Sequence, residues 1–247
     1  MLFSICVFLF LLAAPTVILY SQGYRLDLNP PPGGKIITQT GAFYFKVAPK
    51  GAEIYLNGEL KKTASGLTGS LLIENLSPKT YEIEIRKQGY YHWKKNLTIR
   101  EKQVTEAKNI VLSPQNHNFS VFDENLPEIP ISATSSDQTK LIERLNDYEI
   151  WILFLKDQYG QPQKKAGERV FLLRFSAKIG NVFWLNNDYL IFNVADKIKI
   201  AEIDDRDKLN IIDLAQFPSP QIFWDEKAKK LYISSENKTY LCENLFL

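Results

Sequence analysis

The chain has 247 residues, a formal net charge of +2, 23% charged residues and 13% aromatic residues. This length allows one large or two modest domains, and the interspersed charges argue against a nucleic-acid surface, which needs a clustered basic face. Cysteine occurs only at Cys6 and Cys242, and histidine only at His92 and His117. We therefore expect no disulfide framework, no metal site and no cofactor.

The first stretch of the chain is apolar, because residues Leu2 to Tyr20 carry no charge. About 20 apolar residues can cross a bilayer as a helix, so we predict a transmembrane anchor over residues 1–22. A Pro/Gly linker follows over residues 23–40, with three consecutive prolines at positions 30–32. Two alternatives stay open, a cleaved signal peptide and a buried core helix.

The orientation of this anchor is ambiguous from charge. No basic residue precedes Arg25, whereas Arg25, Lys35 and Lys46 follow the apolar run. Taken alone, the positive-inside rule would leave the body in the cytoplasm, although long domains can translocate despite such charges.

Residues 41–114 contain short β-prone runs separated by turn residues. Tyr81, Ile83 and Ile85 alternate with charged residues, which indicates a strand with one buried face. Asn57-Gly58 is typical of a type I′ hairpin turn. With no helical period, the segment predicts a β-sandwich. The strands that we expect cover residues 41–47, 52–56, 70–74, 81–86, 92–99 and 104–112.

The turns of this segment carry a recognisable motif. Its spacing, P-x-G-A-x-[IV]-Y-x-[ND]-G, then L-x-P-x-x-Y-x-[IV]-x-[IV] and a closing G-Y, resembles the PEGA domain. That family is a small β-sandwich found mostly in bacterial and archaeal surface proteins. The resemblance implies an adhesive or structural role, an exported body and no catalytic residues. Lys50 stands where the family motif has Glu. The residues that carry the resemblance are Pro49, Gly51, Ala52, Asn57, Gly58, Pro78, Gly89 and Tyr90.

An aromatic and basic segment follows the closing Gly89. Tyr90, Tyr91, Trp93 and Lys94 form a candidate ligand patch for sugar or cell-wall polymer. In the alternative interpretation, Tyr90 and Trp93 close the end of the sandwich while Lys94 and Lys95 are solvated.

Residues 115–247 repeat with a period of 40 residues, which separates Trp184 from Trp224. This period is that of a four-stranded β-propeller blade and resembles WD40-like or TolB-like propellers in pattern. We predict about three antiparallel blades. Since closed rings usually have about 4–8 blades, the array is open or atypical, or the chain is truncated. We further predict that residues 119–122 supply the outer strand of the last copy and close the array by its ends. The predicted strands are 129–134, 141–145, 149–155, 170–175, 182–184, 188–192, 197–202, 210–214, 222–224, 230–233 and 239–243.

Catalytic motifs are missing from the sequence, which has no G-x-S-x-G, phosphate loop, H-E-x-x-H or dinucleotide fingerprint. Asp204-Asp205-Arg206-Asp207 lacks the Gly and distal Glu of a calcium loop, so we interpret it as a polar turn.

These features favour a mainly β, non-enzymatic, single-pass protein of the bacterial cell envelope. Its extracytoplasmic body would bind or scaffold a protein or a cell-wall polymer. One alternative is an accessory or sensor subunit that docks a protein partner. Another is a glycan-active hydrolase, which would need acidic or histidine residues clustered in one pocket. The oligomeric state is open.

Overall fold

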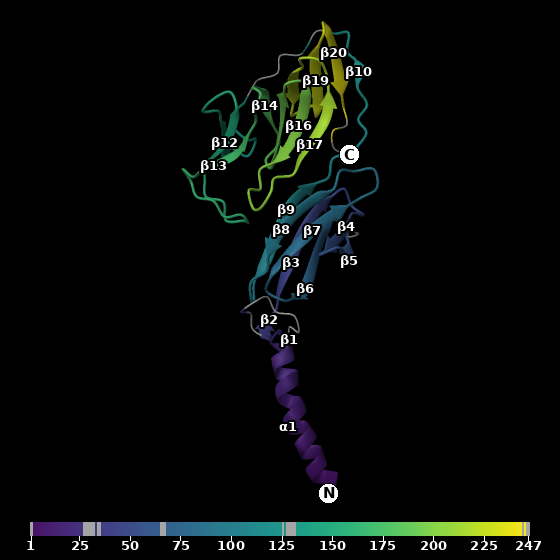
Figure 1. Cartoon of the computed structure of the whole chain (residues 1–247), viewed down its shortest axis with the longest axis vertical. Helices are drawn as coiled ribbons and strands as arrows, with labels where there is room; N and C mark the ends of the chain where they lie inside the picture. The colour runs from purple at the N-terminus through teal and green to yellow at the C-terminus, as the bar shows by residue number, and fades with distance from the viewer. Residues whose placement is uncertain are drawn as a thin grey trace.

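The computed structural model describes residues 2–26, 33, 36–64, 68–124, 126, 132–243 and 245. Helix α1 (Leu2–Ser21) extends away from the β body at one end of an elongated molecule (Figure 1). None of its residues is buried, so the core-helix alternative is wrong. Its length and its mean hydropathy of 2.7 are those of a membrane anchor or a signal sequence.

A short two-stranded sheet joins the helix to the body. Strand β1 (Tyr24–Leu26) pairs antiparallel with β2 (Ile37–Gln39), so part of the predicted linker is a hairpin. The three prolines at positions 30–32 lie outside the described residues.

The next unit is a β-sandwich of two sheets. One sheet has the order β6 (Ser70–Leu76), β3 (Gly41–Ala48), β9 (Val104–Val111), with β3 and β9 parallel. The other has the order β5 (Glu59–Thr63), β4 (Glu53–Leu56), β7 (Thr80–Arg86), β8 (Trp93–Thr98). All six predicted strands are present. Strand β5 was not predicted, because every one of its side chains is exposed and no apolar alternation marks it.

The core of the sandwich lies between these two sheets. Phe43, Phe45, Ile54, Ile83 and Ile85 have no exposed area. The predicted hairpin turn at residues 57–58 is confirmed, since both residues have positive φ, 51° and 80°.

The C-terminal unit consists of three antiparallel sheets. The first has the order β11 (Lys140–Glu143), β12 (Glu149–Phe154), β13 (Arg169–Arg174). The second has the order β14 (Ile179–Asn186), β15 (Tyr189–Val194), β16 (Lys197–Glu202), β17 (Ile211–Gln216). The third has the order β10 (Ser120–Val121), β20 (Lys238–Cys242), β19 (Lys230–Ser235), β18 (Gln221–Asp225). The predicted outer strand is confirmed, because β10 pairs with β20.

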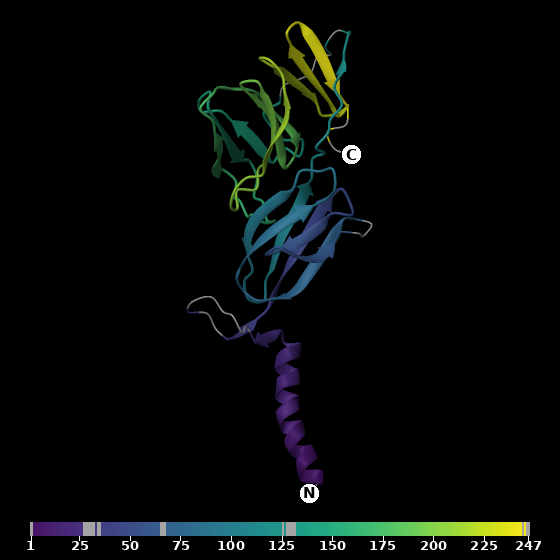
Figure 2. The ribbon, with the colours of Figure 1, turned by 45° about the vertical axis from the view of Figure 1, so that its right-hand side comes forward.

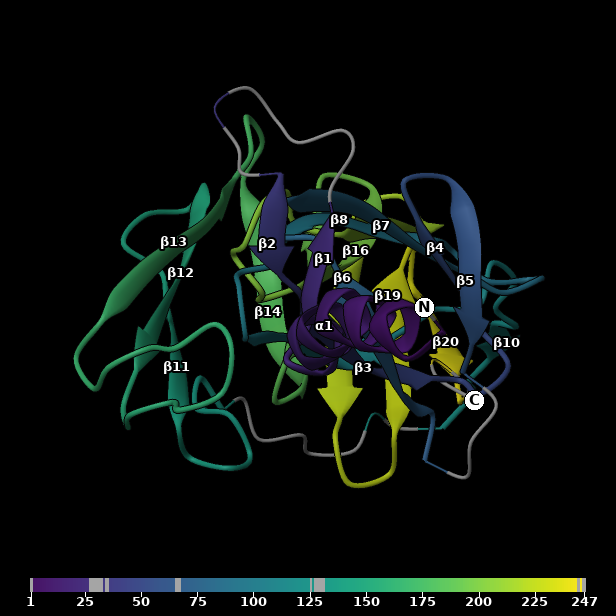
Figure 3. The same cartoon turned by 90° about the horizontal axis from the view of Figure 1, so that it is seen from below.

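These sheets are stacked face to face. One core, which contains Trp184, joins the first two sheets, and a second, which contains Trp224, joins the second and third. Strand β15 of the middle sheet is therefore buried at every position. The sheets stand side by side above the sandwich, at the end away from the helix (Figures 2 and 3).

The predicted blade pattern is thus present as stacked antiparallel sheets. The first sheet has three strands, and an isolated bridge between Thr134 and Leu141 extends it. Residues 129–131 of the strand predicted at 129–134 lie outside the described residues. A closed propeller ring is not seen in the described part of the chain, so propeller architecture stays a prediction.

Candidate functional site at the junction of the two β units

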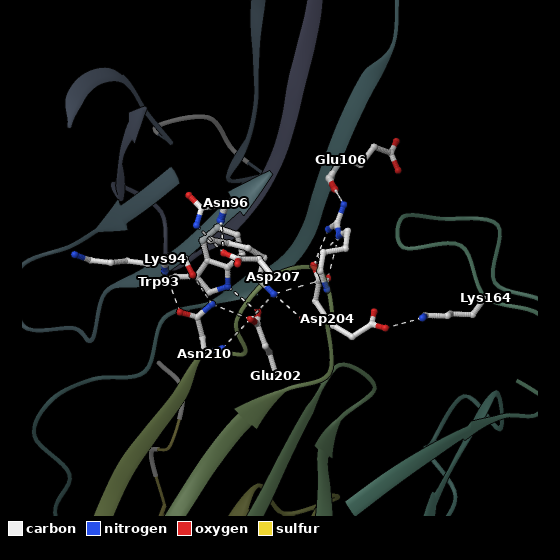
Figure 4. A network of polar contacts seen from close by, with 12 residues as sticks. Trp93, Lys94, Asn96, Glu106, Lys164, Glu202, Asp204, Asp207 and Asn210 are labelled. Atoms are coloured by element: carbon white, nitrogen blue, oxygen red, sulfur yellow. Dashed lines mark hydrogen bonds and ion pairs between the residues drawn. The ribbon is translucent and has the colours of Figure 1, made fainter. Parts of the chain in front are cut away.

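The loop after β16 docks on the edge of the sandwich (Figure 4). Strand β8 is the last strand of its sheet, so one side of its backbone lacks a neighbouring strand. The Asn210 side chain accepts from Lys94 N at 2.9 Å and donates to Lys94 O at 3.0 Å. Asp207 accepts from Asn96 N at 2.7 Å. These two side chains therefore form hydrogen bonds with backbone groups on the free edge of β8, and those groups would otherwise be open to pairing with another strand.

The edge of the other sandwich sheet is capped in the same manner. Gln161 accepts from Glu106 N and donates to Val104 O, both at 3.0 Å, on the edge strand β9. Arg206 Nη1 donates to Glu106 O at 2.8 Å. Side chains of the C-terminal unit thus bind the backbones of both edge strands.

A buried ion pair lies behind these caps. The Lys95 side chain has no exposed area, and its Nζ lies 2.8 Å from Glu202 Oε1. It also donates to Asp204 O at 2.6 Å. The Trp93 indole donates to Glu202 Oε2 at 2.7 Å. A charge removed from water must be paired and hydrogen-bonded, and this arrangement does both. The prediction that Lys95 is solvated is therefore wrong.

The predicted ligand patch is divided by this junction. Tyr90 packs against the sandwich core, and Trp93 is buried, as the end-closing interpretation expected. Tyr91 donates to Asp213 O of β17 at 3.2 Å. Lys94 keeps 58% of its side chain exposed and contacts Glu84 at 3.0 Å. Ligand binding by these residues remains a prediction.

The residues of the PEGA-like motif lie at turns or in the sandwich core, and the two tryptophans of the 40-residue period lie in the cores between the stacked sheets. Gly51 has φ of +82° in the turn after Pro49, and Gly89 has φ of +81° before Tyr90. Ala52 has no exposed area in the sandwich core. Pro78 lies between β6 and β7. These residues support the sandwich, with Trp184 and Trp224 supporting the stacked sheets.

Glu84 organises a charged cluster beside β8. Its carboxylate contacts Arg86, His92 and Lys94, and the residue is only 5% exposed. The hydrogen bond from Arg86 contributes most to holding the pKa of Glu84 down, at about 2, and Lys94 and His92 act in the same direction. The cluster fixes the side chain of Lys94 at the margin of the junction.

A cleft of about 550 Å³ opens next to the junction. Its walls come from β9 (residues 108–110), the loop at residues 157–162, the turns at 137–140 and 187–189, and the end of β16. Tyr159, which is 83% exposed, stands at this cleft. The aspartates, glutamate and lysines that line the cleft are Asp137, Asp157, Asp188, Asp204, Glu202, Lys108 and Lys140.

Most of these carboxylates already have structural partners. Glu202 and Asp204 bind Lys95, Asp137 accepts from Thr139 N at 3.0 Å, and Asp157 accepts from Ala166 N at 2.9 Å. The Asp188 carboxylate makes no hydrogen bond or ion pair with the described residues. Burial raises the pKa of Asp188, and the charge of Lys140 opposes that shift. Asp188 is thus the carboxylate in this lining best placed to meet a ligand.

The polar turn predicted at residues 204–207 is confirmed as part of the loop between β16 and β17. Within the described ranges, no group of three or more His, Cys, Asp or Glu residues could hold a metal ion. Asp188, Glu202 and Asn210 were not predicted as site residues, because only tertiary docking brings them to the junction and its cleft.

Comparison with known proteins agrees with the fold of the first unit. Residues 45–116 match the model of the PEGA domain. This match covers the sandwich except for the first four residues of β3, and it suggests a surface or binding module. A search of curated proteins finds no match to the chain.

Proposed function

We propose that this chain is a non-enzymatic, single-pass membrane protein of the cell envelope that holds a rigid β arm outside the cytoplasm. The arm serves as a binding or scaffolding module for a protein or a cell-wall polymer. The observation that carries the proposal is the junction, where Lys95 and Glu202 form a buried ion pair between the two β units.

The arrangement of the parts suits display away from a membrane. The apolar helix and the stacked sheets lie at opposite ends of the molecule, with the sandwich between them (Figure 2). A junction with capped edge strands and a buried charge pair resists bending, since separation would expose unpaired backbone groups and an ammonium group. The sandwich therefore acts as a stiff spacer, and the cleft beside it offers a polar binding site.

Protease accessibility of the full-length protein tests the location. We expect the protein to stay in the membrane fraction after an alkaline carbonate wash. We also expect digestion of the body in intact cells, or after outer-membrane permeabilisation in a two-membrane cell. Protection until the cytoplasmic membrane is lysed would place the body in the cytoplasm and refute the proposal.

Co-sedimentation with purified cell-wall polymer tests binding at the cleft. Asp188→Ala should weaken binding if the cleft holds the polymer, because it removes the available carboxylate. Asp225→Ala is the control, since Asp225 is the last residue of β18 and does not line the cleft. Equal binding by both variants would show that the cleft does not hold this polymer.

A glycan-active hydrolase is the second candidate function, because the cleft gathers several carboxylates. Glycoside hydrolysis ordinarily needs two carboxyl groups that flank the scissile bond, and Asp188 is the only carboxylate of the described lining without a structural partner. Release of reducing ends from the polymer by the wild-type protein, but not by Asp188→Asn, would favour the hydrolase. A single stoichiometric protein partner would instead favour an accessory subunit.

A further inference from the structure

The outer face of the first stacked sheet carries a group of four apolar side chains flanked by ion pairs. Side chains on β12 alternate, so Ile150 and Ile152 face the middle sheet while Trp151 and Leu153 face away. Leu141 pairs across the strands with Leu153, and Trp151 with Phe171. The rings of Trp151 and Phe171 meet edge to face, 5.2 Å apart, and Phe171 is 46% exposed. We call these four residues, Leu141, Trp151, Leu153 and Phe171, the end face.

Charges beside the end face are neutralised within the same sheet. Arg169 Nε lies 2.8 Å from Glu143, and Arg174 lies 3.6 Å from Glu149. Glu149 also accepts from the Trp151 indole at 3.0 Å. An identical face can therefore approach without bringing uncompensated like charges together. Tryptophan and arginine are also the residues enriched in the energetic centres of protein interfaces.

The opposite end of the stack is already covered. Tyr232 points away from the core on the last sheet, yet it is only 5% exposed, because the Phe122 ring packs against it at 5.1 Å. Leu241 is 9% exposed. The two ends therefore differ, and head-to-tail stacking of copies would have to displace Phe122. A contact between two identical end faces needs no such change and gives the isologous, two-fold arrangement that is commonest in oligomers.

We infer that the end face binds the end face of a second copy of this chain, so that the protein forms a two-fold dimer. The contact would continue a packing mode that the chain already uses twice, with one blade-like sheet laid on the next. This inference does not depend on the cleft and goes beyond the proposed function.

The position of the first sheet is compatible with a dimer whose two α1 helices lie in the same membrane. The first sheet lies at the side of the stack, away from the long axis that passes through α1 (Figures 1 and 3). A two-fold axis parallel to that long axis leaves both helices pointing in the same direction. Confinement in one membrane also raises the effective concentration of the second copy.

The mass of the full-length protein in detergent, from light scattering after size exclusion, tests the inference together with chemical cross-linking in native membranes. We expect a dimer for the wild type. Phe171→Glu should weaken dimerisation at least tenfold, because the contact would bury an unpaired carboxylate. Leu60→Glu is the control, since Leu60 is 53% exposed on β5 of the sandwich, and this variant should stay dimeric.

Leu153→Lys provides a second variant on the neighbouring strand if Phe171→Glu does not fold, with resistance to protease as the check on folding. A monomeric wild type in both detergent and membranes would overturn the inference. A dimer that persists in folded Phe171→Glu or Leu153→Lys would place the contact elsewhere, for example on α1, and would overturn it as well.

Discussion

Replacing Glu202 by glutamine should destabilise the body by about 3 kcal/mol, because it removes the counter-charge of a buried lysine. The Glu202 carboxylate accepts from Trp93 and Lys95, and also from the backbone and side-chain amides of Asn210 at 2.9 and 2.8 Å. Glutamine keeps the shape but turns an amide group towards these donors.

The magnitude follows from what remains around Lys95. Breaking a buried ion pair by removing one partner costs about 3–5 kcal/mol. Lys95 keeps its bond to Asp204 O, and the Asp204 carboxylate lies 3.8 Å away, so we expect the lower end of that range. Glu243→Gln is the matched control. Glu243 pairs with Lys230 at 2.9 Å with 57% of its side chain exposed, and the loss of such an exposed pair should change the stability little.

Urea unfolding of the full-length protein in detergent, followed by tryptophan fluorescence, measures both variants. Hydrogen exchange should also show lost protection in β8 and in the loop at residues 203–210. Adding Lys95→Met to Glu202→Gln should recover part of the loss, because the unpaired ammonium group is then gone. A Glu202→Gln effect no larger than that of Glu243→Gln would refute the assignment of a buried charge pair.

Three further predictions concern single side chains. The lowered pKa of Glu84 stabilises the fold above about pH 4.5, and this contribution is lost as the pH falls towards 2. Glu84→Gln should therefore lower the melting temperature at pH 7, and the difference in melting temperature between variant and wild type should shrink in acid. The raised pKa of Asp188 has the opposite effect: it favours the folded state below about pH 3.8, and this contribution is lost as the pH rises through the raised pKa. Asp188→Asn should therefore raise the melting temperature at pH 7. A lower melting temperature at that pH would contradict this prediction. In Gly180→Ala the new Cβ would collide with the hydrogen-bonded side chain of Asn193, so unfolding in urea should show a loss of about 1–3 kcal/mol.

Local patterns predicted the strands well where side chains alternate between core and solvent. Strand β7 follows this alternation except at Glu84, which is buried under its charged neighbours. Strand β10 followed from counting the strands in each repeat. Strand β5 could not be found in the same way, because it lies at a sheet edge with both faces exposed. Its only sequence clue was the turn at residues 57–58, which implies a returning strand.

The junction was predictable in part. Trp93, Lys95 and Leu97 occupy alternate positions of β8 and are all buried, so the period of two placed Lys95 among apolar neighbours. That position implies a buried carboxylate partner. The identity of the partner could not be predicted, because Glu202 is distant in the chain and reaches Lys95 only when the loop after β16 docks.

The edge caps make the two β units dependent on each other. Without the C-terminal unit, the exposed edges of β8 and β9 would present free backbone groups, and such edges invite pairing with other chains. Trp93 and Lys95 would lose the carboxylate that binds them both. Without the sandwich, the loop at residues 203–210 would lose its backbone partners at Lys94 and at residues 96 and 106. Side-chain caps also block further strand addition at these edges, so the contacts that join the two β units also protect them from aggregation.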